Sequence, residues 1–284
     1  MTDDSTAIVL ILGIMRRSGT NYLYDLLRLH PDCAVRDMIH GPGQEGRLSE
    51  DFLVSQLHLL NDYVQAVQAE WNPHWGNVEA ESAELRFCLG QGLVSFLRRG
   101  IPRGKRLVTK TPSVADLKDV FDFLPEARLV ILVRDGRAVV ESGVKGFLWD
   151  FETAAGSWAT GARQILDLLK DRAGDRDHVV IVRYEDIWRD VEAELRKLFA
   201  FLSLPADIYD FERARALPVR GSSFYRGTSE RPAFTLHGVH WAPVAKTDEF
   251  DPLRRFTEWS SEDHTRFNRI AGEYLKRFGY ENIE

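Results

Sequence analysis

Hydrophobic residues in this chain gather in short unbroken runs separated by longer stretches in which apolar and polar positions alternate at helical spacing. The runs at 7–12, 127–133 and 179–182 are rich in Val, Ile and Leu, so we predict strands there. The stretch 106–112 resembles a further strand. Unbroken apolar strands are typical of a sheet that is buried on both faces, which favours a parallel sheet.

The stretches between these strands predict helices. After the first strand, apolar residues lie on one helical face until Pro31 ends the pattern. Further helices are predicted from Ser49 to about Val64 and over 83–98, 113–124, 138 onward, 151–169, 191–202 and 261–278. Strands that alternate with helices over the whole length indicate an α/β fold, with a parallel sheet and helices on both of its faces.

Nothing in the sequence divides the chain into separate domains. The 284 residues contain no repeat, linker or low-complexity tract, so we predict one domain over 1–284. The segment of about 217–252 is rich in Gly, Pro and Ser and is long for a connection, which suggests a lid over a ligand.

Charge and cysteine content narrow the classes of function. A formal net charge of −6 does not suit a general binder of nucleic acid or of membrane surfaces, so an anionic ligand would need a local basic pocket. The acidic N-terminus and the lack of a long apolar run favour a cytoplasmic protein. Cys33 and Cys88 form no disulfide framework or zinc motif, and we expect two buried thiols.

The turn after the first strand has the composition of an anion-binding loop. It runs from Gly13 to Asn21 and contains two glycines, two arginines, Ser18 and Thr20. A glycine turn between a strand and a helix directs backbone N–H groups and the positive end of the helix dipole at one place. It is not a Walker A loop, because Thr20 follows Gly19 where that motif has a lysine. A glycine turn that binds nothing is the alternative.

Other polar residues follow the predicted strands in the same way. Arg17, Lys110, Arg134 and Tyr184 each lie near the end of a different strand. Ligands of open parallel sheets bind beyond the carboxyl ends of the strands, so these four side chains are expected at one edge.

Two of these motifs resemble those of sulfotransferases that use 3′-phosphoadenosine 5′-phosphosulfate (PAPS). Arg17-Ser18-Gly19-Thr20-Asn21 is similar to the family's 5′-phosphosulfate loop, and Arg134-Asp135-Gly136-Arg137-Ala138, with Ser142 beyond it, to its 3′-phosphate motif. Tyr184 matches a tyrosine that contacts the cofactor, and Phe278-Gly279-Tyr280 is a typical ending. The resemblance covers about 7–280 and is closest to the tyrosylprotein and bacterial branches.

The resemblance implies the P-loop-like sulfotransferase fold and the transfer of a sulfuryl group from PAPS to a hydroxyl or amine, without a metal. Arg17 and the N–H groups of residues 18–21 would hold the 5′-phosphosulfate, and Arg134 and Ser142 the 3′-phosphate. Lys110 would steady the sulfuryl group and the leaving oxygen. The looser matches are Ser222, Ser223 and Lys246, as late contacts to the cofactor.

The general base is ambiguous. Family members use a Glu or His after the first helix, and Glu50, His40, Asp37 and Glu45 all lie in that range. Glu50 ranks first because it resembles an acidic position at the start of the second helix of bacterial relatives, and His40 ranks second. An acid in a first helical turn also complements the helix dipole without any catalytic role.

Two other functions stay open, a nucleotide or small-molecule kinase of the P-loop type and a nucleotide-binding protein without activity. The missing Walker lysine argues against a kinase, and the joint presence of Arg17, Lys110, Arg134 and Ser142 against an idle protein. The sequence contains no motif that identifies the acceptor, although the acidic net charge favours a small molecule. Aromatic residues that line an acceptor pocket or simply pack in the core are Trp71, Trp75, Phe147, Trp149 and Phe151.

Overall fold

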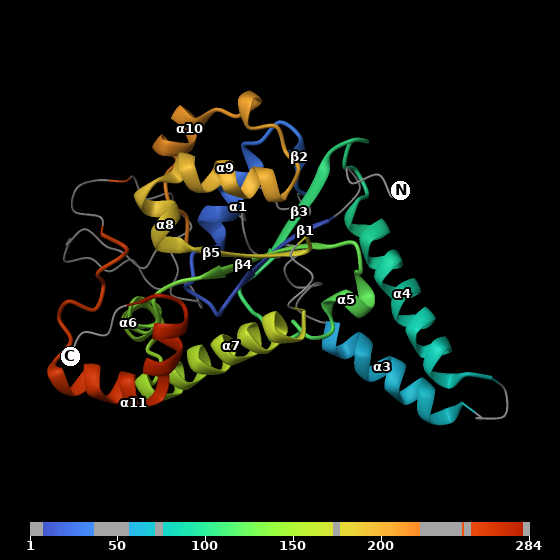
Figure 1. The fold of residues 1–284 in the computed structure, drawn as a ribbon, viewed down its shortest axis with the longest axis horizontal. Coiled ribbons are helices and arrows are strands. Elements are labelled where there is room, and N and C mark those ends of the chain that lie inside the picture. The colour runs from blue at the N-terminus through green and yellow to red at the C-terminus, as the bar shows by residue number, and fades with distance from the viewer. Residues whose placement is uncertain are drawn as a thin grey trace.

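A five-stranded, all-parallel sheet forms the centre of the protein (Figure 1). The computed structural model describes residues 8–36, 57–71, 76–172, 177–221, 246 and 251–280. The strand order is β2-β3-β1-β4-β5. The strands are β1 (Val9–Gly13), β2 (Cys33–Ala34), β3 (Arg106–Thr111), β4 (Arg128–Val133) and β5 (Val179–Arg183). The predicted parallel sheet is therefore confirmed.

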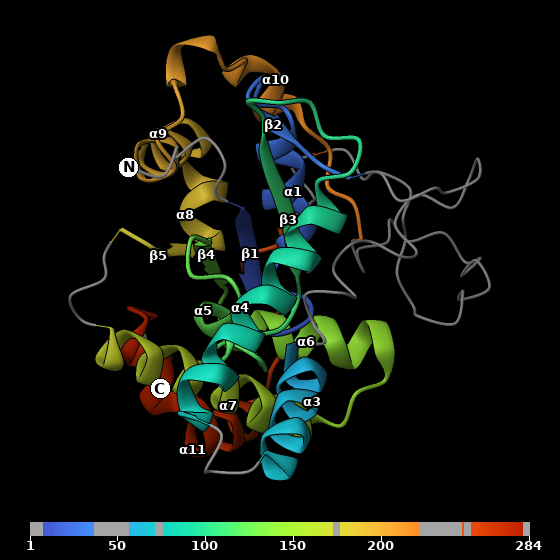
Figure 2. The ribbon, with the colours of Figure 1, turned by 90° about the vertical axis from the view of Figure 1, so that its right-hand side faces the viewer.

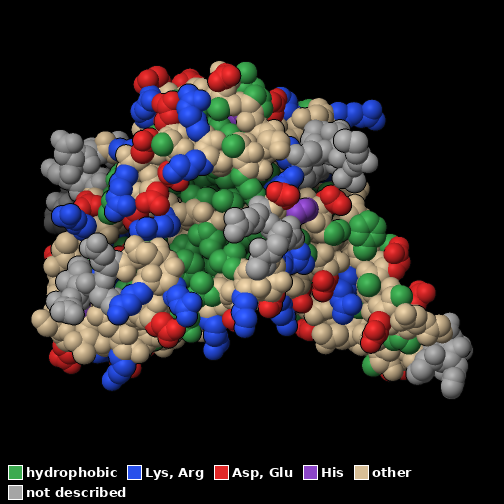
Figure 3. All heavy atoms as spheres, in the orientation of Figure 1, with side chains coloured by type: hydrophobic (Ala, Val, Ile, Leu, Met, Phe, Trp, Pro, Cys, Tyr) green, Lys and Arg blue, Asp and Glu red, His purple; other side chains and the backbone are tan. Residues whose placement is uncertain are grey.

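The two faces of the sheet bury different side chains of the same strands. In β1, Leu10 and Leu12 belong to one hydrophobic core, whereas Val9 and Ile11 belong to the other. Successive side chains of a strand point to opposite faces, so an unbroken apolar run supplies both cores at once. Strand β5 is the outermost strand on one side of the sheet, and most of its residues are only half-buried. Figure 3 shows hydrophobic side chains on the surface where Figure 1 draws this strand.

Helices cover both faces (Figures 1 and 2). One core packs against α1 (Thr20–Arg28), α8 (Tyr184–Arg189), α9 (Val191–Phe201) and α10 (Phe211–Ala216), with a short 3-10 helix, η3 (Ala206–Ile208), between the last two. The other core packs against α3 (Leu57–Glu70), α4 (Val78–Leu97), α5 (Val120–Phe123), α6 (Gly136–Phe147), α7 (Phe151–Asp171) and α11 (Ser261–Arg277). In Figure 1 these two sets lie above and below the sheet, and α3 and α4 extend away from it.

Several predicted boundaries are wrong, each for a local reason. The helix predicted at 83 begins at Val78, because the Asn77 side chain caps it by accepting from the N–H groups of Glu79 and Ala80 at 3.1 and 3.2 Å. Of the stretch 113–124, which was predicted to be one helix, only α5 is helical. Before α5, turns join residues three apart, such as Leu117 N–H to the Val114 carbonyl at 3.1 Å, and they direct apolar side chains into the core. Helices α8 and α10 were not predicted.

Some predictions fall outside the described residues. The start of the helix predicted from Ser49 and most of the lid-like segment 217–252 are among them. Cys33 is buried as expected, but Cys88 is exposed, because α4 packs through the side that carries Ser82, Gly90 and Leu97. Of the helices that the structure describes, none is long and apolar enough to cross a membrane.

Candidate functional site

The loop after β1 is a tight turn that leads into α1. Its backbone has positive φ at Arg17 (76°) and at Gly19 (94°), the residue before the helix. Within the turn, the Ser18 hydroxyl accepts from the Met15 N–H at 3.2 Å and donates to the Met15 carbonyl. No side chain caps α1. In its first turn the Tyr22 and Leu23 N–H groups donate to the Gly19 carbonyl at 3.0 and 3.3 Å. The N–H groups of Thr20 and Asn21 are thus the ones left to meet an anion, which the helix dipole favours there.

Gly19 has a second reason to be glycine. A Cβ atom at this position would lie 2.4 Å from Cδ2 of Tyr184, which follows β5 and is buried. The loop after β1 thus packs its backbone directly on the ring of Tyr184. The tyrosine that the sequence singled out lies under the loop.

The Arg17 side chain joins three segments. Its Nε donates to Ser142 Oγ in α6 at 3.0 Å, and its Nη1 donates to the Gly221 carbonyl at 2.8 Å. Its guanidinium also lies 5.3 Å from the centre of the Phe147 ring. The Arg17 side chain therefore reaches toward Ser142, which was predicted to bind the 3′-phosphate. The backbone of Arg17 belongs to the loop after β1.

Arg134 lies beneath the same loop. Its Nη1 donates to the Arg17 carbonyl at 2.8 Å, its Nη2 donates to the Pro252 carbonyl, and its guanidinium stacks 4.6 Å from the Tyr184 ring centre. Its Nε is buried without a hydrogen-bond partner among the described atoms. The two arginine-bearing turns, 117 residues apart, are thus in direct contact.

Hydrogen bonds of Asp135 hold the turn after β4. The Asp135 carboxylate caps α6 by accepting from the Arg137 N–H at 2.9 Å, and it holds the Arg137 side chain through Nε and Nη2 at 3.0 and 2.7 Å. The Asp135 N–H donates to Glu185 Oε1 at 2.9 Å. This cap sets the direction of α6, which presents Ser142 to Arg17 two turns later.

Positive charge is concentrated at this edge of the sheet. Burial first, then the charges of Arg134 and Arg255, lower the pKa of Arg17 to about 9, and burial and Arg134 lower the pKa of Arg255 to about 10. The guanidinium groups stay protonated at neutral pH, so they repel one another. Neither Arg17 nor Arg134 forms an ion pair with a carboxylate of the described residues. The arrangement therefore suits an anionic ligand with more than one charge.

Lys110 lies at the end of β3, on the other side of β1. It is buried, and its ammonium lies 5.4 Å from the ring centre of Tyr24 in α1. Because β3 and β4 are the two neighbours of β1, Lys110 and Arg134 flank the loop from opposite sides.

Lys246 binds Tyr22 of α1 and the backbone of α10. Its Nζ donates to the Tyr22 hydroxyl at 2.6 Å and to the Arg215 carbonyl at 3.0 Å, and it lies over the rings of Tyr22 and Trp188. Burial lowers its pKa to about 8. It therefore faces α1, α8 and α10.

The remaining predicted site residues lie outside the part of the chain that the structure describes. Ser222 and Ser223 lie outside the described residues, as do all four candidates for the base, Glu50, His40, Asp37 and Glu45. Within the described ranges, no group of three His, Cys, Asp or Glu side chains is arranged to hold a metal ion.

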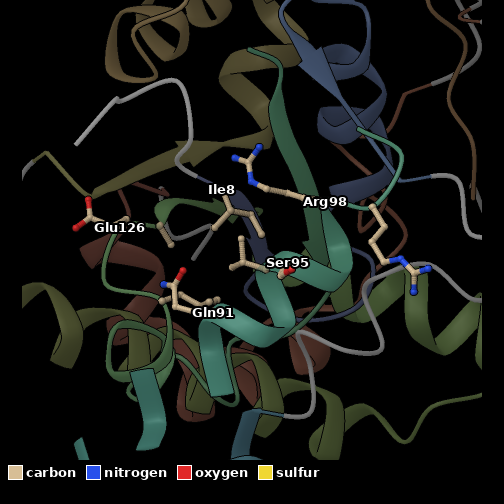
Figure 4. Close-up of a pocket in the computed structure, with 9 residues that line it drawn as sticks. Ile8, Gln91, Ser95, Arg98 and Glu126 are labelled. Atoms are coloured by element: carbon tan, nitrogen blue, oxygen red, sulfur yellow. The ribbon is translucent and has the colours of Figure 1, made fainter. Parts of the chain in front are cut away.

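A separate hollow of about 590 Å³ lies at the opposite edge of the sheet (Figure 4). It is lined by Ile8 and Ala127, which precede β1 and β4, and by Arg98, Arg99 and Glu126 among others. These residues lie at the amino ends of the strands, so the hollow is not part of the candidate site.

Sequence reasoning missed several residues of the site. Glu185 adjoins Tyr184 but has no motif of its own that indicates its contact with Asp135. Phe147 was noted only as a core or acceptor-pocket residue. Arg220 binds the buried Asp25 carboxylate through Nε at 2.8 Å and through Nη2, and thereby anchors Gly221. Each of these contacts joins residues far apart in sequence, so no local pattern could have revealed them.

Comparison with known proteins gives a consistent result. A family model described as "Sulfotransferase family" matches residues 9–208. The Drosophila melanogaster "Protein-tyrosine sulfotransferase" is 26% identical over 223 residues, which are 72% of this chain and 41% of that protein. The Caenorhabditis elegans "Protein-tyrosine sulfotransferase A" is 24% identical over 289 residues, 97% of this chain and 68% of that protein. The chain thus spans less than half the length of the Drosophila relative.

Solved structures share the fold. The sulfotransferase domain from the Synechococcus PCC 7002 olefin synthase superposes with a TM-score of 0.56 at 20% identity and covers 97% of this chain and 95% of that one. The sulfotransferase domain from the curacin biosynthetic pathway gives a TM-score of 0.53 at 18% identity, covering 98% and 99%. At these identities the likeness establishes the architecture of the sheet and helices.

Proposed function

The chain belongs to the sulfotransferase family, and we propose that it transfers a sulfuryl group from PAPS to a hydroxyl or amine of an acceptor. The observation that carries this proposal is the contact between the two arginine-bearing turns, in which Arg134 binds the loop carbonyl of Arg17 and Arg17 binds Ser142. Both turns belong to one basic edge, as a donor with two anionic ends requires.

The residues present fit such a donor. The uncapped N-terminus of α1 suits a 5′-phosphosulfate, and Gly19 lets the backbone approach closely. The buried Nε of Arg134 and the Ser142 hydroxyl suit the 3′-phosphate, and the Arg17 guanidinium lies beside Ser142. Tyr184 supports the loop from below. Ser222, Ser223 and Lys246 stay proposed late contacts, and the Lys246 amine faces Tyr22.

When bound, PAPS supplies the sulfuryl group, and adenosine 3′,5′-bisphosphate is the product. Lys110 would place a compact positive charge where negative charge develops on the leaving oxygen, which is the main way to lower the barrier of such a transfer. The acceptor hydroxyl or amine must lose its proton to a base. Glu50 is our first candidate for that base, followed by His40, Asp37 and Glu45.

The acceptor class needs a direct test. We propose a small molecule, on the basis of the acidic charge of the chain. A tyrosine side chain of a peptide is the second candidate, because the two relatives described above are named protein-tyrosine sulfotransferases. Incubation with labelled PAPS and either a panel of phenols and alcohols or an acidic tyrosine peptide separates these two classes.

Calorimetry tests donor binding. We expect adenosine 3′,5′-bisphosphate to bind without magnesium and far more tightly than Mg-ATP. A preference for Mg-ATP would replace this proposal with a P-loop kinase. Binding of both nucleotides only at millimolar concentration would contradict the role given to the two turns.

Turnover tests the role of Lys110. Lys110→Ala should reduce kcat about 100-fold or more, the usual effect of removing one group that stabilises transition-state charge. Lys118→Ala, an exposed lysine in the turn before α5, is the control and should turn over like the wild type. Equal sulfuryl release by wild type and Lys110→Ala would exclude a catalytic lysine, and turnover by none of the three would favour a nucleotide-binding protein without activity.

A further inference from the structure

The carboxylate of Glu185 is buried at the point where three separate segments of the chain meet. The residue is 4% exposed and follows Tyr184 at the start of α8. Its Oε1 accepts from the Asp135 N–H at 2.9 Å, and its Oε2 accepts from the Tyr280 hydroxyl at 2.8 Å. The turn after β4, the end of β5 and the residues after α11 are thus joined by one side chain.

The end of α11 is built to deliver Tyr280 to this carboxylate. Gly279 has a positive φ of 74°, the Gly279 N–H donates to the Lys276 carbonyl at 3.0 Å, and the Tyr280 N–H donates to the Leu275 carbonyl at 2.9 Å. This pair of bonds is the Schellman motif that ends a helix and reverses the chain. It turns Tyr280 into the core, where its ring stacks 4.4 Å from the Arg183 guanidinium.

The carboxylate acts on the backbone of the proposed 3′-phosphate turn. Asp135 both donates its N–H to Glu185 and caps α6, and the preceding residue is Arg134. Burial raises the pKa of the Glu185 carboxyl above its ordinary value, and the Asp135 N–H, the Arg134 charge and the Tyr280 hydroxyl act against that shift. A buried carboxylate with two donors is held firmly, because losing either donor leaves an acceptor without its partner.

We propose that Glu185 and Tyr280 are positioning residues, which fix the Arg134 turn in the geometry that binds the 3′-phosphate of the donor. The inference rests on the proposed function for its ligand. It assigns the end of the chain a role in donor affinity, without contact between Tyr280 and the donor. A residue that does not touch the ligand can affect binding through the groups that it orients.

The test compares two buried tyrosines in the full chain. Tyr280→Phe removes the hydroxyl that holds Glu185. Tyr209→Phe is the matched control, because Tyr209 is equally buried and its hydroxyl donates to the Leu26 carbonyl at 2.8 Å, in the last turn of α1 and thus at the other end of that helix from the loop. Both variants lose one buried hydrogen bond and should lose thermal stability, Tyr280→Phe somewhat more because its acceptor is a carboxylate.

Adenosine 3′,5′-bisphosphate is the probe of binding. We expect Tyr280→Phe to raise its Kd on the order of tenfold, the lower end of what loss of an outer-shell partner costs, while Tyr209→Phe leaves the Kd unchanged. With PAPS and an acceptor, the KM for the donor should rise with kcat preserved. Glu185→Gln, which keeps an acceptor for the Asp135 N–H, should bind more tightly than Glu185→Ala.

Hydrogen exchange of the ligand-free protein gives a second readout that does not depend on the donor. The Asp135 amide should exchange faster in Tyr280→Phe than in the wild type or in Tyr209→Phe. If the two Phe variants have the same Kd and the same Asp135 exchange, the positioning role is wrong. A wild-type protein that binds no bisphosphate would refute the proposed function instead, and faster Asp135 exchange would still support Glu185 and Tyr280 as the residues that fix the turn.

Discussion

Replacing Gly19 by alanine tests whether the loop after β1 and the ring of Tyr184 form one unit. Gly19 has a φ of 94°, which alanine adopts only with strain. The added Cβ would also lie 2.4 and 2.5 Å from two carbons of the Tyr184 ring. Tyr184 is buried and carries the Arg134 guanidinium on its face, so the ring cannot move without disturbing that arginine.

Two costs add up in this variant. A left-handed conformation costs an L-residue about 1–2 kcal/mol, and an extra carbon in a well-packed site costs about 1–3 kcal/mol. A total of roughly 2–5 kcal/mol corresponds to a fall in Tm of roughly 5–15 °C for a chain of this size. Displacement of the ring should also weaken binding of adenosine 3′,5′-bisphosphate by at least about tenfold, the effect of losing about 1.4 kcal/mol.

Calorimetry and thermal unfolding of the same preparations measure both effects. Gly156→Ala in α7 is the control, because nothing lies within 4 Å of its added Cβ, and alanine there should stabilise the helix by about 0.5–1 kcal/mol. A Gly19→Ala protein that melts like the wild type would refute the packing argument. One that is destabilised but binds the bisphosphate normally would refute the link between the Tyr184 ring and the donor site.

Three further predictions concern side chains at or beside this edge. Arg17→Lys cannot span Ser142 and Gly221 as the guanidinium does, so the Kd of the bisphosphate should rise about 10- to 100-fold, and calorimetry that finds an unchanged Kd would contradict the role of the fork. Arg220→Ala leaves the buried Asp25 carboxylate with Arg28 as its remaining arginine partner, whose Nη1 lies 3.7 Å away, and should lower stability by about 1–3 kcal/mol, measured by urea unfolding, whereas a loss of a few tenths would mean that the Arg220–Asp25 pair is solvated. Lys246, whose pKa burial lowers to about 8 from 10.5, should be acylated by an amine-directed reagent with a midpoint near pH 8 in peptide mapping, and a midpoint near 10.5 would contradict its burial. Since the unfolded chain keeps that proton up to about pH 10.4, it binds more protons than the folded chain between pH 8 and 10, so this lysine adds stability as the pH rises through that window.

Four of the five strands were predictable because each is defined by its own residues, whereas β2 is only two residues long and was not predicted as a strand. Runs such as 129–133 are apolar at every position, and a strand buried on both faces requires that pattern. The stretch 113–124 has helical spacing as well, yet most of it forms successive turns, and only α5 is helical. These turns direct its apolar residues into the core. Helix α8 is six residues long and begins directly at the end of β5, too short for a periodic pattern to be recognised.

The candidate site was predictable only where one motif supplies its own chemistry. The glycine turn and the Arg134 turn each contain the residues that define them, so both were found. The bonds from Arg17 to Ser142 and from Tyr280 to Glu185 join residues 125 and 95 positions apart, and only the folded chain brings them together. The base has no such signature, because an acid near the start of a helix is equally expected as a partner of the helix dipole.

The strand order explains how motifs so far apart in sequence can meet at one proposed ligand site. Strands β3, β1, β4 and β5 are consecutive neighbours, so Lys110, the loop with Arg17, Arg134 and Tyr184 lie in a row along one edge in that order. Neighbouring strands are about 4.8 Å apart, so Lys110 and Arg134, two spacings apart, are separated by roughly 10 Å across the loop between them. We therefore propose that a donor with one anionic group at the loop points its reacting end toward Lys110 and its other charge toward Arg134. A donor complex with the sulfuryl group at the Arg134 end would contradict this orientation.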